Sequence, residues 1–218
     1  MFVGAKIDFR YWMQKYEEDY SKDVDGKWPI FIDEKGIEHE ERSPYFETIS
    51  RVLQKRGYLL KKEFVRIGKW KTERQTKSYE TNTDNKVKNL TKEALKAPDT
   101  KKIQILNRLR GVGVPVASAI LTIVYPTEYC VIDYRTWRAL LWLRAMATKD
   151  RLTFASYKDY SDLLDQYDTY GGVHVYYSFG NALKKIGEKR NMTPRQVEMA
   201  LWKFDEMKGE CSENIDGC

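Results

Sequence analysis

LNRLRGVGVPVASAILTIVYPTEYCVIDYRTWRAL, residues 106–140, is the stretch from which the fold of this chain can be predicted. Apolar residues at helical spacing lie on both sides of Gly111-Val112-Gly113, which predicts two short helices joined by a glycine turn, a helix-hairpin-helix. The glycines allow backbone conformations with positive φ and the close approach of a ligand. The second helix starts at Val114-Pro115 and directs free N–H groups towards an anion.

A hairpin of this kind binds a nucleic-acid backbone without reading its sequence, so Gly111, Val112, Gly113 and Val114 are candidate DNA contacts. A tight turn between two packed core helices would show the same pattern. The residue that favours the DNA-binding interpretation over a plain turn is Asp133, 20 positions after Gly113. It lies between an apolar run and a helical segment, where a helix N-cap is expected. Its simplest role is that of a cap.

The order of hairpin, second helix, apolar turn and aspartate resembles the core of the helix-hairpin-helix DNA glycosylase superfamily. The resemblance covers about residues 100–145 and is looser elsewhere. It places the family's catalytic aspartate at Asp133. It also implies a helical fold of two lobes, with the pocket for a flipped base in the cleft between them.

Two departures from the family pattern bear on the expected chemistry. Members that also cleave the strand carry a lysine 18 residues before the aspartate, where this chain has Pro115. Proline has no amine that could form a Schiff base, so a monofunctional hydrolase is expected. The cysteines are Cys130, Cys211 and Cys218, too few for the four-cysteine iron–sulfur cluster of some relatives.

A second informative stretch is GKWKTERQTKSYETN, residues 68–82. It has no apolar periodicity and is predicted to be an exposed loop. Cations interleaved with aromatic residues can bind phosphates and stack on a base. Three cations of this stretch are candidate DNA contacts: Lys69, Lys71 and Arg74. Arg135, shortly after Asp133, is a fourth. Candidates for the wall of the base pocket, two of them from a later helix, are Trp70, Tyr79, Tyr176 and Tyr177. A solvated loop with Trp70 in the core is the plainer interpretation.

The composition is that of a folded, basic protein. The chain has 218 residues, 42% hydrophobic and 13% aromatic, with a net charge of +6 and a pI near 9.0. The charge fits a polyanionic partner better than an acidic one, although a solvated surface explains it too. No apolar run is long enough for a membrane span and no signal peptide is evident, so a cytoplasmic, nucleoid-associated monomer is expected. No metal site is expected, and the only cofactor considered is a monovalent cation at the hairpin.

Almost every other segment is predicted to be helical, which makes the fold class mainly α. A first helix is expected between Ile7 and Tyr20, then a small β-hairpin or irregular arm within residues 27–42. Further helices are expected from Ser43 to Gly57, over residues 60–67 and 83–97, from Ser156, and after Gly172 and Thr193. Residues 1–208 form one two-lobed domain in this prediction, with the hairpin lobe at about 82–145, and 209–218 form a disordered polar tail.

The predicted activity is excision of a modified base from double-stranded DNA, leaving an abasic site, as in base-excision repair. An N-glycosidic bond breaks through a cationic sugar, which the carboxylate of Asp133 would stabilise. The base must first be flipped out of the duplex. Alternatives are a non-catalytic DNA-binding protein, excision of a hypermodified base of phage DNA in defence, and a lyase that uses Lys101 or Lys102.

Overall fold

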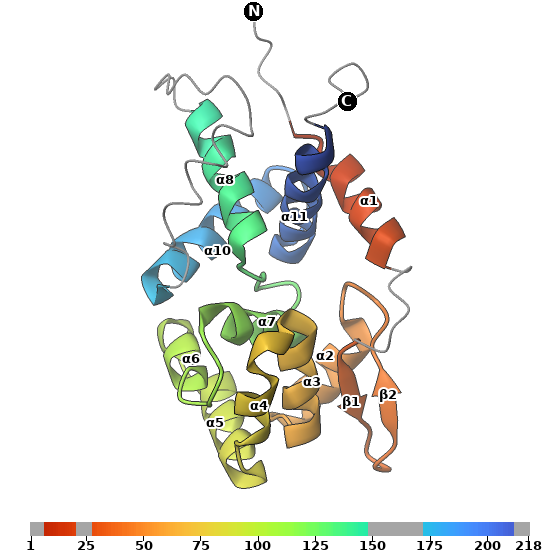
Figure 1. Cartoon of the computed structure of the whole chain (residues 1–218), viewed down its shortest axis with the longest axis vertical. Helices are drawn as coiled ribbons and strands as arrows, with labels where there is room; N and C mark the ends of the chain where they lie inside the picture. The colour runs from red at the N-terminus through yellow and green to blue at the C-terminus, as the bar shows by residue number, and fades with distance from the viewer. Residues whose placement is uncertain (1–6, 21–27, 148–171, 212–218) are drawn as a thin grey trace, which may run out of the picture.

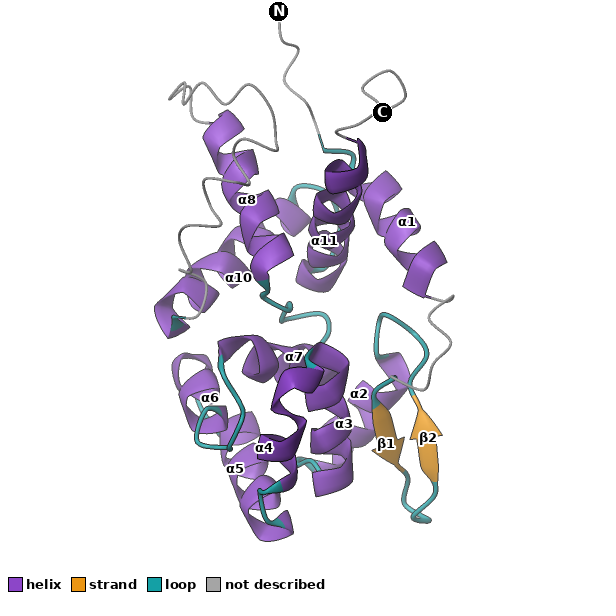
Figure 2. Cartoon of the chain, in the orientation of Figure 1, coloured by secondary structure: helices purple, strands orange, loops and turns teal. Residues whose placement is uncertain are grey.

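The structure is a computed structural model that describes residues 7–20, 28–147 and 172–211. It confirms a mainly helical fold with little sheet (Figures 1 and 2). The elements of the described residues are α1 Phe9–Tyr20, β1 Ile30–Ile32, β2 Glu38–Glu40, α2 Glu47–Arg56, α3 Lys61–Lys71, the 3-10 helix η1 Glu73–Gln75, α4 Thr76–Glu80, α5 Asp84–Lys96, α6 Asp99–Leu106, α7 Val114–Val124, α8 Tyr134–Ala147, α10 Val173–Glu188 and α11 Pro194–Cys211.

The elements gather in two groups, one above the other in Figure 1. α11 packs against α1, α8 and α10, so this group joins the N-terminal helix to the C-terminal ones. The second group contains the antiparallel β1–β2 hairpin, with Ile30 opposite Glu40, and the helices from α2 to α7. The group that carries the helix-hairpin-helix therefore begins well before residue 82, and α8 lies in the other group.

The predicted helix-hairpin-helix is present, formed by α6, the turn 107–113 and α7. Gly111 has φ +83°, a conformation that L side chains rarely adopt. Gly113 is extended instead (φ −98°, ψ −178°), so only the first glycine needs the left-handed conformation that we expected of both. Every residue of α7 except Pro115 is buried, because its sequence is apolar almost all round, and α7 forms the centre of its group.

Tyr79 connects the hairpin to α3. Its ring is fully buried, and it lies between two glycines that are distant in sequence. A Cβ atom on Gly68 would come within 2.7 Å of the ring, and one on Gly111 within 2.9 Å. The ring fits there because neither glycine has a side chain.

The prediction of an exposed loop over residues 68–82 was wrong. α3 continues to Lys71, and η1 and α4 follow directly. Periodicity missed these helices because they are short and are held by tertiary packing, chiefly that of Tyr79, rather than by an apolar stripe of their own. The Tyr79 hydroxyl also donates a hydrogen bond to the Thr72 carbonyl oxygen (3.3 Å).

The helix expected to start at Ser43-Pro44 begins at Glu47 instead. Phe46 adopts a left-handed conformation (φ 57°) before it. The carboxylate of Glu41 accepts hydrogen bonds from the N–H groups of Thr48 and Ile49 (3.0 and 2.9 Å). A side chain from outside the helix therefore caps it, which moves its start past the expected N-cap.

Other helix ends agree with the sequence pattern. Thr83 caps α5 by accepting a hydrogen bond from the Lys86 N–H (3.2 Å). Thr193 and Gln196 form the expected capping box at the start of α11 (2.8 and 3.2 Å). α11 extends to Cys211, so a helix covers the first residues of the predicted polar tail. The helix predicted from Ser156 and the positions after Cys211 lie outside the described residues. None of the helices described is long and apolar enough to cross a membrane.

Candidate active site

A pocket of about 600 Å³ contains Asp133 and is lined by residues of both groups of helices. Its walls come from α1, from the last two residues of α3, from the segment that leads to α8, and from α11. The residues that line it are Tyr16, Asp19, Tyr20, Trp70, Lys71, Val131, Asp133, Arg195, Glu198, Trp202, Lys203 and Glu206. The pocket therefore combines aromatic rings with charged groups.

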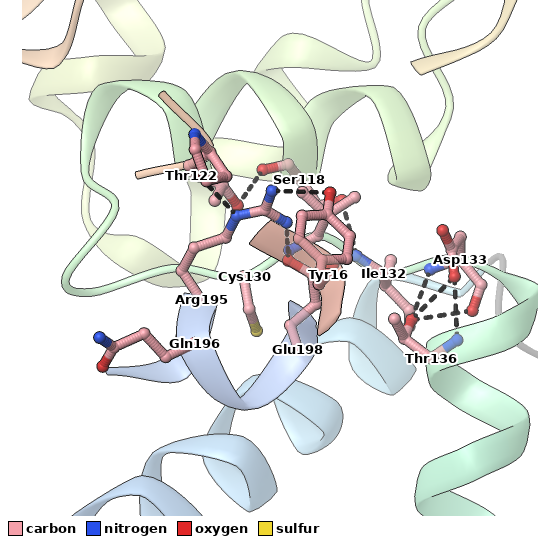
Figure 3. A network of polar contacts seen from close by, with 12 residues as sticks. Tyr16, Ser118, Thr122, Cys130, Ile132, Asp133, Thr136, Arg195, Gln196 and Glu198 are labelled. Atoms are coloured by element: carbon pink, nitrogen blue, oxygen red, sulfur yellow. Dashed lines mark hydrogen bonds and ion pairs between the residues drawn. The ribbon is translucent and has the colours of Figure 1, made fainter. Parts of the chain in front are cut away.

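Asp133 is the N-cap of α8, as its sequence context predicted. Its Oδ1 accepts a hydrogen bond from the N–H of Thr136 (2.9 Å), and its own N–H donates to the Thr136 hydroxyl (3.0 Å; Figure 3). This reciprocal arrangement uses one carboxylate oxygen for the cap and leaves Oδ2 for another partner.

Three other elements hold the backbone that leads to Asp133. The Cys130 carbonyl accepts a hydrogen bond from the Tyr176 hydroxyl (3.3 Å). The Val131 N–H donates to the carboxylate of Glu198 on α11 (3.4 Å), and the Ile132 N–H donates to the Ser118 hydroxyl on α7 (3.1 Å). The carboxylate is thus supported by contacts from both groups of helices (Figure 3).

The partner of the second carboxylate oxygen is Lys71. Its Nζ lies 2.8 Å from Asp133 Oδ2, and the two side chains are only 12% and 20% exposed. Burial acts to raise the pKa of Asp133, but the Lys71 ammonium and the hydrogen bonds from Thr136 outweigh it, and the net pKa is lowered. The site therefore holds Asp133 as a carboxylate.

A buried ion pair forms another wall. Arg195 pairs with Glu198 one helical turn later, and both are at most 2% exposed. Arg195 also donates to the Tyr16 hydroxyl (3.1 Å; Figure 3) and to the Pro44 carbonyl (3.2 Å). Burial raises the pKa of Glu198, and Arg195 opposes that rise. We did not foresee this pair, although its i, i+3 spacing was visible in the sequence.

Of the four residues predicted to line the base pocket, the structure places only Trp70 beside Asp133. Tyr79 lies in the core. Tyr176 and Tyr177 line a separate pocket of about 210 Å³, and the Tyr177 hydroxyl donates to the Asp99 carbonyl. Three further aromatic residues of the Asp133 pocket were not anticipated as such: Tyr16, Tyr20 and Trp202. The first two lie in a helix that the sequence predicted, but helical spacing gives no sign of a pocket, and no local signal marked the third.

The predicted DNA contacts are dispersed. At the hairpin Gly113 is exposed, whereas the side chains of Val112 and Val114 are buried, so the turn presents backbone rather than side chains. The N-cap residue of α7 is Gly113, which has no side chain to cap the helix.

The cationic candidates differ in their surroundings. Lys71 points into the pocket with Asp133, and Lys69 lies 3.3 Å from Glu80. Arg74 is exposed. Arg135 stacks over the ring of Trp202 (4.9 Å), which lines the pocket.

Neither of the lysines that the sequence offered for a lyase, Lys101 and Lys102, lies at the pocket. Lys102 donates its Nζ hydrogen bond to the Leu95 carbonyl (3.0 Å), and Lys101 is exposed on α6. Pro115 occupies the first turn of α7. In the part of the chain that the structure describes, no three His, Cys, Asp or Glu side chains come together in a way that could hold a metal ion.

Comparisons with models of known protein families, with curated proteins and with solved structures found no match. The functional argument therefore depends on the site itself.

Proposed function

We propose that this protein is a DNA glycosylase that flips a damaged or modified base into the Asp133 pocket and hydrolyses its N-glycosidic bond, leaving an abasic site. The observation that carries the proposal is the charged Asp133 carboxylate, fixed at a helix N-terminus inside a pocket with aromatic walls. A helix-hairpin-helix whose second helix has a glycine at its N-cap accompanies it.

Each feature of the site has a task in this reaction. The bond to the base breaks as positive charge develops on the sugar, and a fixed carboxylate stabilises that charge without reorganising. The aromatic side chains offer faces on which a flipped base can stack, with Trp70 on one wall and Trp202 on another. The pocket is about 600 Å³, within the usual range for small-ligand sites.

The hairpin supports the proposal from outside the pocket. The N-terminus of α7 offers backbone N–H groups to a phosphate, and Gly113 lets the phosphate come close. The net charge of +6 favours association with DNA of any sequence. In this proposal the partner is double-stranded DNA, and the base to be removed arises by damage or as a modification of invading phage DNA.

A second candidate is a DNA-binding protein without catalytic activity. The observation in its favour is the Lys71 ammonium, which compensates the charge of Asp133 in the free protein. Such a protein would bind modified DNA and release nothing.

The two candidates separate in one experiment. Duplexes that each carry one modified base are incubated with the protein and then treated with hot alkali, which cuts the strand at abasic sites. The panel should contain oxidised and alkylated purines, deaminated pyrimidines and a bulky modified cytosine. Cleavage of at least one duplex after the alkali step, abolished in Asp133→Asn, supports the glycosylase. Binding without any base release would favour the second candidate.

A further inference from the structure

Lys71 places a primary amine where a reaction at the sugar would occur. It is the last residue of α3, and its Nζ lies 2.8 Å from the carboxylate proposed to face C1′. A group that close to Asp133 must also be close to a sugar carbon that Asp133 contacts. Pro115 excluded an amine from α7, but the fold supplies one from another helix.

The other lysine in the pocket is less suited to attack a substrate. Lys203 is 4% exposed and is held between two carboxylates, Asp19 and Glu206. Lys71 has a single carboxylate partner among the ion pairs of the described residues, and that partner is itself proposed to contact the substrate.

We propose that Lys71 gives the pocket a second activity, cleavage of the DNA strand at an abasic site through a covalent imine. The inference rests on the proposed glycosylase function, because the abasic sugar is the product of base release. It replaces the monofunctional enzyme that Pro115 had suggested with one that can continue from hydrolysis to strand cleavage.

The reaction begins after water has displaced the base. The sugar ring opens to an aldehyde at C1′. Lys71 releases one proton to water, and its amine adds to the carbonyl carbon. The carbonyl oxygen takes one proton from the nitrogen and takes up the released proton, and it leaves as water as the C1′–N double bond of the iminium forms. The resulting iminium makes the C2′ hydrogen acidic, and the Asp133 carboxylate is placed to accept that proton.

Strand cleavage follows from the electron pair that remains when C2′ loses its proton. The pair left by the C2′ proton forms a C1′–C2′ double bond and then expels the phosphate from C3′, which breaks the C3′–O bond. Water hydrolyses the imine, returns Lys71 and leaves an unsaturated aldehyde on one fragment. This series of steps needs no oxidant and no reductant.

The test uses the full chain and a duplex with one abasic site, so it does not depend on knowing the modified base. Borohydride, which reduces an imine to a stable amine, is added during the incubation. We expect a covalent protein–DNA species, and peptide mapping by mass spectrometry should find the adduct on Lys71. No covalent species, or an adduct on a different amine, would overturn the inference.

Variants separate this role from a structural one. Lys71→Arg keeps the positive charge beside Asp133, but its guanidinium is not deprotonated in proteins, so trapping and strand cleavage should be lost while abasic DNA is still bound. Lys101→Arg, on the exposed face of α6, is the matched control and should be trapped like the wild type. Trapping retained in Lys71→Arg contradicts the inference even if the protein releases bases, whereas trapping on Lys71 without base release from any duplex contradicts only the proposed glycosylase.

Discussion

At the scale of single residues, the chemistry of the site depends on how Lys71 and Asp133 affect each other. A carboxylate in a partly closed pocket would otherwise tend to take up a proton. The ammonium at 2.8 Å keeps it charged, and the cap hydrogen bonds from Thr136 fix its direction. The pair therefore keeps Asp133 in the charged form that it needs if it is to stabilise a cationic transition state.

The first prediction concerns Asp133→Asn. The amide can still cap α8, so the fold should be kept while the negative charge is lost. Base release should slow by about a hundredfold or more, and DNA affinity should change little. Single-turnover release and a binding titration on the same duplex check both parts. Full activity in the variant would show that Asp133 is only a cap.

The second prediction concerns pH. Because the pKa of Asp133 is lowered, the carboxylate stays charged as the pH falls below the value at which an ordinary aspartate takes up its proton. The rate of base release should therefore fall only at lower pH. In Lys71→Met the effect of burial remains without the opposing ammonium, so the pKa of Asp133 should rise and the acid limb should move to higher pH.

Rate–pH profiles of wild type and Lys71→Met measure this shift, with Lys101→Met as a control whose profile should match the wild type. An unchanged acid limb in Lys71→Met would mean that another group controls it.

At the scale of elements, the two glycines of the hairpin have different tasks. Gly111 adopts positive φ and faces Tyr79, so it is required by the fold. Gly113 is extended and exposed, and a Cβ there would meet only the Pro115 ring at 3.8 Å. A substitution at Gly113 is therefore compatible with the free protein but stands where a phosphate would approach.

The third prediction follows from that difference. Gly113→Ala should fold normally, weaken binding to all DNA sequences alike, and lower the salt dependence by about one unit if one phosphate contact is lost. Gly111→Ala should instead destabilise the protein by about 1–3 kcal/mol because of the backbone strain.

Titrations at several salt concentrations and thermal unfolding of both variants distinguish the two effects. The control is Gly180→Ala in α10, where the added methyl group meets no atom within 4 Å and DNA affinity should not change. Equal affinity of Gly113→Ala and wild type would remove the hairpin from the DNA interface.

The sequence allowed the hairpin, the cap at Asp133 and most helix ends to be predicted, because each depends on residues close together in the chain. The pocket could not be predicted in the same way. Its walls join Tyr16, Trp70 and Trp202, which only tertiary packing brings together. The contact of Lys71 with Asp133 spans 62 positions and left no periodic signal.

At the scale of the whole molecule, Arg195 connects the two groups of helices. It lies on α11, yet it donates to the Pro44 carbonyl of the other group and stacks on the Phe46 ring (5.0 Å). It also holds Glu198, which in turn accepts a hydrogen bond from Val131 beside the site. Stability and the shape of the pocket therefore depend on the same side chain.

The fourth prediction concerns this connection. Arg195→Ala leaves Glu198 buried without its partner and should cost about 3–5 kcal/mol of folding free energy. Arg108→Ala is the matched control, because it breaks an exposed pair with Glu93 and should cost at most about 1 kcal/mol. Chemical denaturation of both variants measures the difference. Similar losses in the two variants would contradict a special role for Arg195.

Tyr79 has a consequence for how the protein would hold DNA. Its ring is clamped between Gly68, three residues before Lys71, and Gly111, two residues before the exposed Gly113. The ring acts as a rigid spacer that sets the distance between the turn and the amine in the pocket. If DNA binds as proposed, a backbone held at the turn would present its neighbouring sugars to Lys71 at a constant distance. The position of the turn on the strand, and not the base sequence, would then decide which nucleotide reaches the pocket.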